Sequence, residues 1–148
     1  MTYLTVTNNI GNAGGGIYYF KSGGYLSHST VSNNSANITY AGHSGGILLA
    51  ESDPVLTNVV VSMNEAEWDA GGMKIGSMSN PALINVTVVE NTAQQTGGGI
   101  LNQGNPIVRN VTIANNSSGD SEEVAHFGFS AINTIIWNNS LDPTCFNI

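Results

Sequence analysis

The chain has little charge and very few basic residues. Only 9% of its 148 residues are charged, and three Lys or Arg residues stand against ten Asp or Glu residues, which gives a net charge of −7. Globular proteins usually have about 25% charged residues. A surface so poor in cations repels phosphate backbones, so we expect no nucleic-acid partner.

Cysteine and long apolar runs are also scarce. Cys145 is the single cysteine, which excludes an internal disulfide framework and a cysteine-rich zinc site. No run of about 18 apolar residues occurs, so we expect no transmembrane segment. No export signal is visible, and Met1 opens directly on strand-like sequence, so we expect a trimmed chain or part of a longer protein.

Asparagine and glycine are abundant instead, with 20 and 18 residues. Such a composition can indicate disorder. Regularly spaced Val, Ile and Leu argue against disorder here, because their burial offsets the entropy lost on folding.

One motif recurs with spacings of 25, 30, 27, 25 and 23 residues, and each copy ends in an asparagine after a short β-branched run. The six copies end at Asn9, Asn34, Asn64, Asn91, Asn116 and Asn139. A second column lies six positions earlier, at Asn58, Asn85, Asn110 and Asn133, with Tyr3 and His28 in the first two copies. Two or three glycines followed by an apolar residue recur at 14–17, 45–47, 71–73 and 97–100, and each of these contains a glycine pair directly before the apolar residue.

The period and the residue types favour strands over helices. In "ALINVTVV", alternation places Leu83, Val86 and Val88 on one side and Ile84 and Thr87 on the other. Three short strands per repeat, separated by bends, make one coil of a parallel β-helix, and successive coils stack at about 4.8 Å.

We therefore predict an all-β fold, a right-handed single-stranded parallel β-helix of about five to six coils in one domain over residues 1–148. The predicted coils are approximately 1–13 (partial), 14–44, 45–70, 71–96, 97–123 and 124–148.

Both asparagine columns are predicted to be structural ladders. A buried Asn at a bend can bond to the Asn one coil away and cap the backbone groups of the bend. We expect Asn85 and Asn110 to be buried, and Asn110→Leu to destabilise by about 1–3 kcal/mol. The glycine pairs are expected to mark close backbone approach or positive φ.

The "GGxI…VxxNxA" pattern resembles the GGxI/FxxN repeats of the chlamydial polymorphic outer-membrane proteins. It is similar also to the "NPxLxNVTxxxNxA…GGGI" repeats of bacterial secreted and cell-surface right-handed β-helix proteins, whose closing coils resemble "NTIIWNN" at 133–139. Val or Ile replaces the Phe of the chlamydial motif in every copy. The resemblance implies an extracellular or cell-surface β-helix, often adhesive.

The sequence identifies no catalytic residue. Sugar cleavage needs two carboxylates across the scissile bond, or an acidic calcium cluster with a strong base. Acidic residues gather in two loops, which are either solvated or weak Ca²⁺ sites. These candidates are Glu65, Glu67, Asp69, Asp120, Glu122 and Glu123. His28, His43 and His126 lie in different repeats. We expect no cofactor, and a carbohydrate-active β-helix is the alternative function.

Alternation also predicts an unusually apolar outer surface, which suggests a partner. Its members are Tyr18, Tyr25, Leu48, Val55, Leu101, Ile107 and Phe129. A register error of one residue would exchange the two faces. A separate outward column contains Thr5, Thr30, Val60, Thr87, Thr112 and Ile135. That column makes an ice-binding solenoid a lesser alternative, although Thr is common on solvated strands.

The coil edges around Thr5–Val6 and Ile135–Trp137 are expected to be exposed and complementary. Head-to-tail stacking through them would give filaments. The sequence thus favours a non-catalytic structural or adhesive module. Its expected partners are further copies of itself or the rest of a longer surface protein, with carbohydrate as another partner class.

Overall fold

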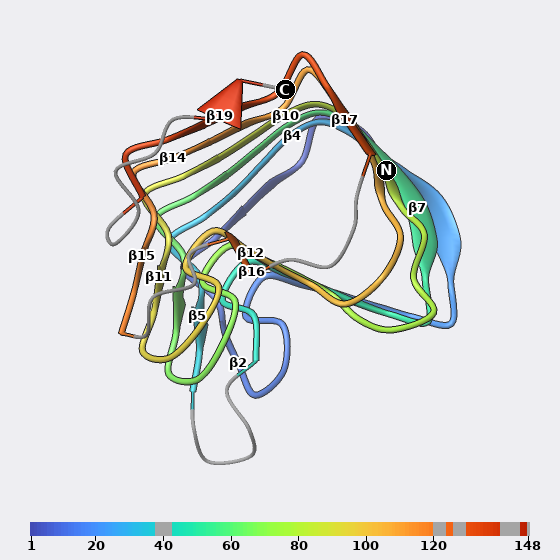
Figure 1. Cartoon of the computed structure of the whole chain (residues 1–148). Coiled ribbons are helices and arrows are strands. Elements are labelled where there is room, and N and C mark those ends of the chain that lie inside the picture. The colour runs from blue at the N-terminus through green and yellow to red at the C-terminus, as the bar shows by residue number, and fades with distance from the viewer. Residues whose placement is uncertain (38–42, 120–123, 126–129, 140–145, 148) are drawn as a thin grey trace.

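A computed structural model describes the chain except residues 38–42, 120–123, 126–129, 140–145 and 148. The described residues form strands, turns and bends but no helix, and the strands stack as coils of a parallel β-solenoid (Figure 1). With the C-terminal coils in front, the chain runs leftward along the top, down the left side and back to the right, so the solenoid is right-handed. The predicted fold class is confirmed.

Three sheets line the solenoid. Sheet 1 comprises β1 (Thr5–Thr7), β4 (Gly23–Ser32), β7 (Asp53–Ser62), β10 (Ala82–Val89), β13 (Ile107–Arg109), β14 (Thr112–Ala114), β17 (Ser130–Ile132), β18 (Ile135–Trp137) and β19 (Phe146–Asn147). Sheet 2 comprises β2 (Ile10–Gly11), β5 (Ser35–Ala36), β8 (Glu65–Ala66), β11 (Thr92–Ala93) and β15 (Ser117–Ser118). Sheet 3 comprises β3 (Ile17–Phe20), β6 (Ile47–Ala50), β9 (Met73–Ile75), β12 (Ile100–Asn102) and β16 (Val124–Ala125).

The strand register matches the spacing of the sequence repeat. Along sheet 1, the paired positions run through Thr5, Thr30, Val60, Thr87, Thr112 and Ile135. The unequal spacings are taken up by the segments between strands. The described strands build about four turns, slightly fewer than the five to six predicted.

Bends with positive φ allow the chain to turn while keeping apolar side chains inside. Asn85 has φ 52°, and this bend lets both Leu83 and Val86 point inward although they are three residues apart. The same bend recurs, with positive φ, at Tyr3, His28, Asn58, Asn110 and Asn133. Asn tolerates this backbone region better than most residues.

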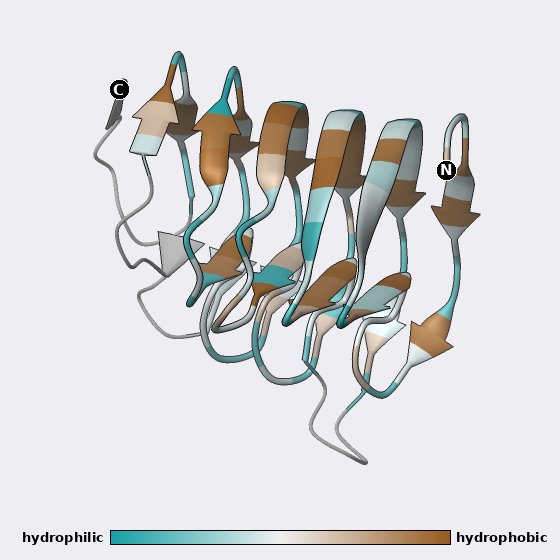
Figure 2. Ribbon diagram, turned by 90° about the vertical axis from the view of Figure 1, so that its right-hand side faces the viewer, coloured by the Kyte–Doolittle hydropathy of each residue, from teal (hydrophilic) through white to brown (hydrophobic). Residues whose placement is uncertain are grey.

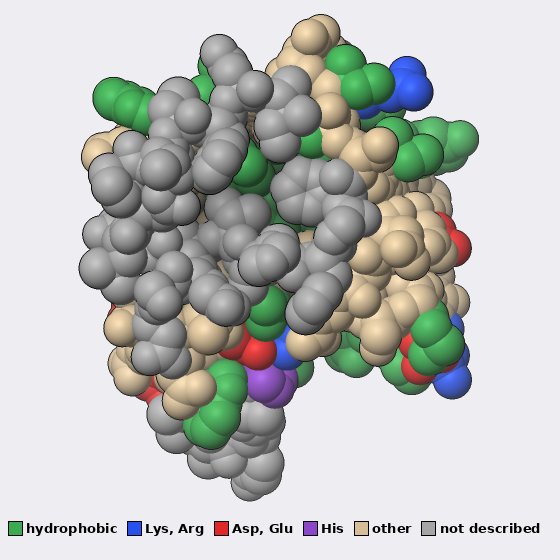
Figure 3. All heavy atoms as spheres, in the orientation of Figure 1, with side chains coloured by type: hydrophobic (Ala, Val, Ile, Leu, Met, Phe, Trp, Pro, Cys, Tyr) green, Lys and Arg blue, Asp and Glu red, His purple; other side chains and the backbone are tan. Residues whose placement is uncertain are grey.

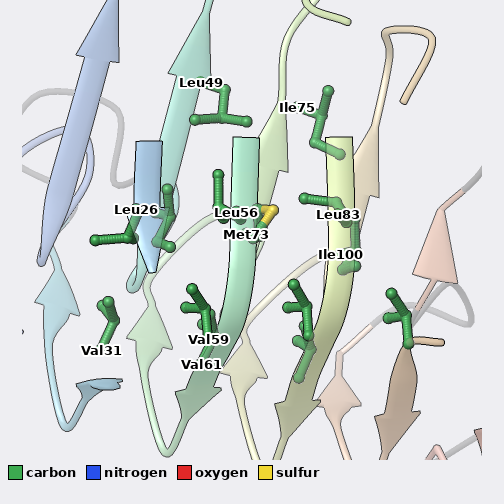
Figure 4. Packing of buried hydrophobic residues seen from close by; sticks show 14 of the residues in the cluster. Leu26, Val31, Leu49, Leu56, Val59, Val61, Met73, Ile75, Leu83 and Ile100 are labelled. Atoms are coloured by element: carbon green, nitrogen blue, oxygen red, sulfur yellow. The ribbon is translucent and has the colours of Figure 1, made fainter. Parts of the chain in front are cut away.

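The core consists of apolar side chains stacked in columns from coil to coil (Figure 4). One column contains Leu26, Leu56, Leu83 and Val108, all at most 3% exposed. Figure 2 shows apolar bands that continue across neighbouring strands. Burial of these columns is the main stabilising contribution to the fold.

Strand β18, at the C-terminal edge of sheet 1, has a partner on its outer side. β19 lies antiparallel to β18, with Ile135 opposite Asn147 and Ile136 opposite Phe146. The prediction of an exposed edge at Ile135–Trp137 is therefore wrong, because the chain covers this edge with its own strand.

None of the described segments is a helix of the length and apolarity needed to cross a membrane.

Candidate functional site

The asparagines that end the repeats form a continuous ladder along the interior. Each side-chain Nδ2 donates to the Oδ1 of the next Asn at 2.9–3.0 Å, and the backbone N–H of the same residue donates to that same oxygen. The ladder runs through Asn9, Asn34, Asn64, Asn91, Asn116 and Asn139. All but the first are buried. This ladder is confirmed. Each bond between two ladder asparagines runs toward the C-terminal coil, and Nδ2 of Asn34, Asn64, Asn91 and Asn116 also donates to a carbonyl of the preceding coil.

The second glycine of each pair has no room for a side chain because the ladder lies beside it, and the first glycine packs closely against the backbone of sheet 2. A Cβ on Gly72 would lie 2.5 Å from the Gly99 carbonyl oxygen and 2.9 Å from the Nδ2 of Asn91. Gly46 and Gly16 meet Asn64 and Asn34 in the same way. The predicted close backbone approach is confirmed.

The second asparagine column is not buried. Asn85, Asn110 and Asn133 are exposed and Asn58 is partly exposed. Asn85 donates to Asn58 at 3.1 Å and Asn133 to Asn110 at 3.2 Å, both in solvent-exposed positions. The prediction of buried amides at Asn85 and Asn110 is therefore wrong, and burial no longer supports the stability cost assigned to Asn110→Leu. These residues are selected by the positive φ of the bend.

The predicted apolar outer surface is not continuous in the structure. Tyr18, Tyr25 and Ile107 are exposed by 52%, 70% and 52%, and Val55 is partly exposed. Leu48 and Leu101 are buried, so their assignment to the surface is wrong. Phe129 lies outside the described residues.

Leu48 and Leu101 point away from the core but are covered by the chain that precedes each glycine pair. Leu101 packs with Ala70. A Cβ on Gly97 would lie 2.8 Å from the Cβ of Leu101. Along the outward column of Tyr25, Val55 and Ile107, the next paired residue after Ile107 is Ser130. Ser130, and not Phe129, therefore continues this column.

The threonine column is in register but does not form a broad hydroxyl plane. In the neighbouring outward column, Ser32, Ser62 and Ala114 are at most 8% exposed. Val60 and Ile135 interrupt the threonines. The flat array of hydroxyls expected of an ice-binding face is thus not formed by the described strands.

The acidic side chains of the loop at 65–69 do not lie together around one point. Glu65 is exposed, Glu67 is partly exposed, and Asp69 is buried against a lysine. The described residues contain no group of three or more His, Cys, Asp or Glu side chains that could hold a metal ion. Asp120, Glu122 and Glu123 lie outside the described residues.

A cluster of His43, Asp69 and Lys74 lies on the outer side of sheet 3. The Nδ1 of His43 is 2.6 Å from Asp69 Oδ1, and the Nζ of Lys74 donates to Asp69 Oδ2 at 2.8 Å. The side chains of His43, Asp69 and Lys74 are 31%, 10% and 13% exposed. In Figure 3, acidic, basic and histidine side chains lie next to one another in the lower middle of the view.

The partners in this cluster determine the chemistry of the imidazole. A carboxylate beside a lysine accepts hydrogen bonds, so the hydrogen of the ring lies on the Nδ1 of His43. In its neutral form the ring then keeps Nε2 as an acceptor, and the 3.2 Å approach of Lys74 Nζ to Nδ1 is a contact only. The cluster can therefore both donate and accept hydrogen bonds at a surface that is partly shielded from solvent.

The sequence contained a signal for this cluster that alternation alone did not use. His43 and Asp69 each stand two positions before a glycine pair, and Lys74 follows the second pair by two. Ser44 N–H donates to the Asp69 carbonyl, which places His43 and Asp69 in neighbouring coils. Alignment on the glycine pairs would have brought the two side chains together.

Two aromatic rings lie on the same face of sheet 3. Tyr18 and Phe20 are 52% and 54% exposed, and their ring centroids are 6.1 Å apart. Lys21 Nζ lies 5.2 Å from the Phe20 ring centroid. Tyr18, Leu48 and Lys74 occupy one column of the sheet. An aromatic pair and a polar cluster thus share one outer surface, which we call the sheet 3 face.

No protein-family model, no curated protein and no solved structure matches this chain.

Proposed function

We propose that this protein is a non-catalytic structural and adhesive module of an exported or cell-surface protein. The sheet 3 face is the observation that supports the proposal. It combines exposed aromatic rings with a partly buried polar cluster on a rigid, hydrogen-bonded support. Aromatic rings and buried polar groups are the usual anchors of binding surfaces. The similarity of the repeats to those of surface β-helix proteins supports export.

The composition of the cluster argues against catalysis. Glycoside hydrolysis needs two carboxylates on either side of the scissile bond. In the described part of the sheet 3 face, the cluster contains the single carboxylate of Asp69. Lys74 and His43 take both of its oxygens. A carboxylate held this way is poorly placed to act as a nucleophile or a base.

A turnover screen tests this function. Purified protein is incubated with pectin, alginate, chondroitin or xylan, with and without Ca²⁺, and the products are measured by chromatography. We expect no product from any of them. Turnover that is lost in Asp69→Asn would instead establish a carbohydrate-active enzyme.

A further inference from the structure

We propose that the sheet 3 face binds a neutral carbohydrate chain that lies along the solenoid axis. This inference rests on the proposed non-catalytic binding function and adds the chemical class of the partner, the residues that hold it and its direction.

The aromatic pair supplies the apolar part of the site. Tyr18 and Phe20 project outward from β3 on either side of Tyr19, which points into the core. Their rings are tilted at 45° to each other, so they present two differently inclined surfaces. The C–H faces of sugar rings pack against such surfaces, because aromatic rings combine a large apolar area with a negative face.

The His43, Asp69 and Lys74 cluster supplies the polar part. His43 Nε2 is an acceptor when the ring is neutral with its hydrogen on Nδ1, and Lys74 has three N–H donors, of which Asp69 takes one. Sugar hydroxyls both donate and accept, so they match this pair of groups. Because the cluster is only partly exposed, its side chains are already held in place, which lowers the entropy cost of binding.

The register of the strands sets the shape of the ligand. Tyr18 and Lys74 flank Leu48 in one column, so they lie two strand spacings apart, about 10 Å. One sugar ring cannot span this distance. An oligosaccharide that extends along the solenoid axis, over the segment that covers Leu48, can contact both the aromatic pair and the cluster.

Charge favours a neutral ligand over an acidic one. The chain has net charge −7, and the single cation of the cluster, Lys74, is already paired with Asp69. A polyuronate would meet repulsion from the protein as a whole without an unpaired cation in the cluster to offset it.

A glycan array followed by calorimetry tests the site. The probes are immobilised neutral gluco-, manno- and xylo-oligosaccharides, with oligogalacturonate as the acidic comparison. We expect binding to at least one neutral series and none to oligogalacturonate. Tyr18→Ala and Phe20→Ala should each weaken this binding about tenfold, a loss of about 1.4 kcal/mol.

Matched variants separate the site from the rest of the surface. Tyr25→Ala removes an exposed tyrosine from sheet 1 and should leave binding unchanged. Lys74→Met should weaken binding, and His28→Gln, on an exposed bend, should not. If Lys74→Met fails to fold, Tyr18→Ala against Tyr25→Ala still decides the result.

Three results would overturn the inference: no neutral probe bound, oligogalacturonate preferred, or Tyr18→Ala and Tyr25→Ala equal in effect. If no neutral probe is bound and no turnover is seen, the carbohydrate inference fails but the non-catalytic function is not refuted. Cleavage of a probe would refute that function as well.

Discussion

At the scale of single residues, asparagine has two different tasks in this protein. In the interior ladder it satisfies buried backbone groups of neighbouring coils. Asn91, for example, donates to Asn116 Oδ1 and to the carbonyls of Val61 and Val89, and accepts from Asn64. At the exposed bends, Asn85 and its equivalents are selected for a positive φ. One amino acid thus recurs in two columns for unrelated reasons.

This difference predicts unequal costs for the same substitution. Asn91→Ala leaves several buried donors and acceptors without partners, and we expect it to lower the free energy of unfolding by about 3–5 kcal/mol. Asn85→Ala loses an exposed bond and places Ala at positive φ, which should cost about 1–2 kcal/mol. Urea denaturation of both variants measures the difference. Equal costs would show that the interior ladder is not a special source of stability.

At the scale of strands and sheets, the register was predictable from the sequence and the coverage of the outer faces was not. Each coil must place an Asn against the ladder, so the motif fixes which residues pair across coils. The inward residues Leu83, Val86 and Val88 were also predicted, although the bend at Asn85, and not alternation, places Leu83 and Val86 on the same side. The exposed surface was less predictable, because alternation does not show what lies over an outward side chain.

Leu48 and Leu101 illustrate that limit. Both point outward, as predicted, yet the segment before each glycine pair folds over them and buries them. The same segments bring His43 and Asp69 to Lys74. The segments that bury Leu48 and Leu101, and so interrupt the predicted apolar surface, therefore also form the polar cluster. Period-two alternation predicts neither the burial of these two leucines nor the polar cluster, since the covering residues lie at bends.

Tyr19, on strand β3, should make the stability of the protein depend on pH. Tyr19 on this strand is 6% exposed, its hydroxyl has no hydrogen-bond partner among the described residues, and burial raises its pKa. The unfolded chain loses this proton near pH 10, whereas the folded chain retains it to higher pH. The stabilisation is therefore complete below about pH 10 and is lost as pH rises through the folded-state pKa.

Urea midpoints measured from pH 8 to 11 test this assignment. We expect the fall in stability at alkaline pH to be smaller in Tyr19→Phe than in the unmodified chain. At neutral pH the variant should be as stable or more stable by about 1 kcal/mol, because an unpaired buried hydroxyl is removed. Tyr18→Phe, on the exposed face of the same strand, is the matched control for the removal of a tyrosine hydroxyl. An identical alkaline fall in Tyr19→Phe would refute the assignment.

At the scale of the whole molecule, the three sheets make a solenoid whose two ends differ. At one end, β1 is the outermost strand of sheet 1. At the other, β19 lies antiparallel along β18 and occupies the edge that another parallel coil would need. An antiparallel strand interrupts the pattern of the coils, so it works against the head-to-tail stacking that uncovered edges would favour.

We therefore predict that β19 limits self-association. Removing residues 140–148 should free the edge of β18 and give concentration-dependent oligomers by light scattering, beyond any formed by the full chain. Thr30 donates its N–H to the Leu4 carbonyl, so the N–H of Thr5 points to the opposite edge. Thr5→Pro in the shortened chain removes that donor and should reduce the oligomers. A shortened chain that stays monomeric, or one whose oligomers are unaffected by Thr5→Pro, would show that these strand edges do not associate.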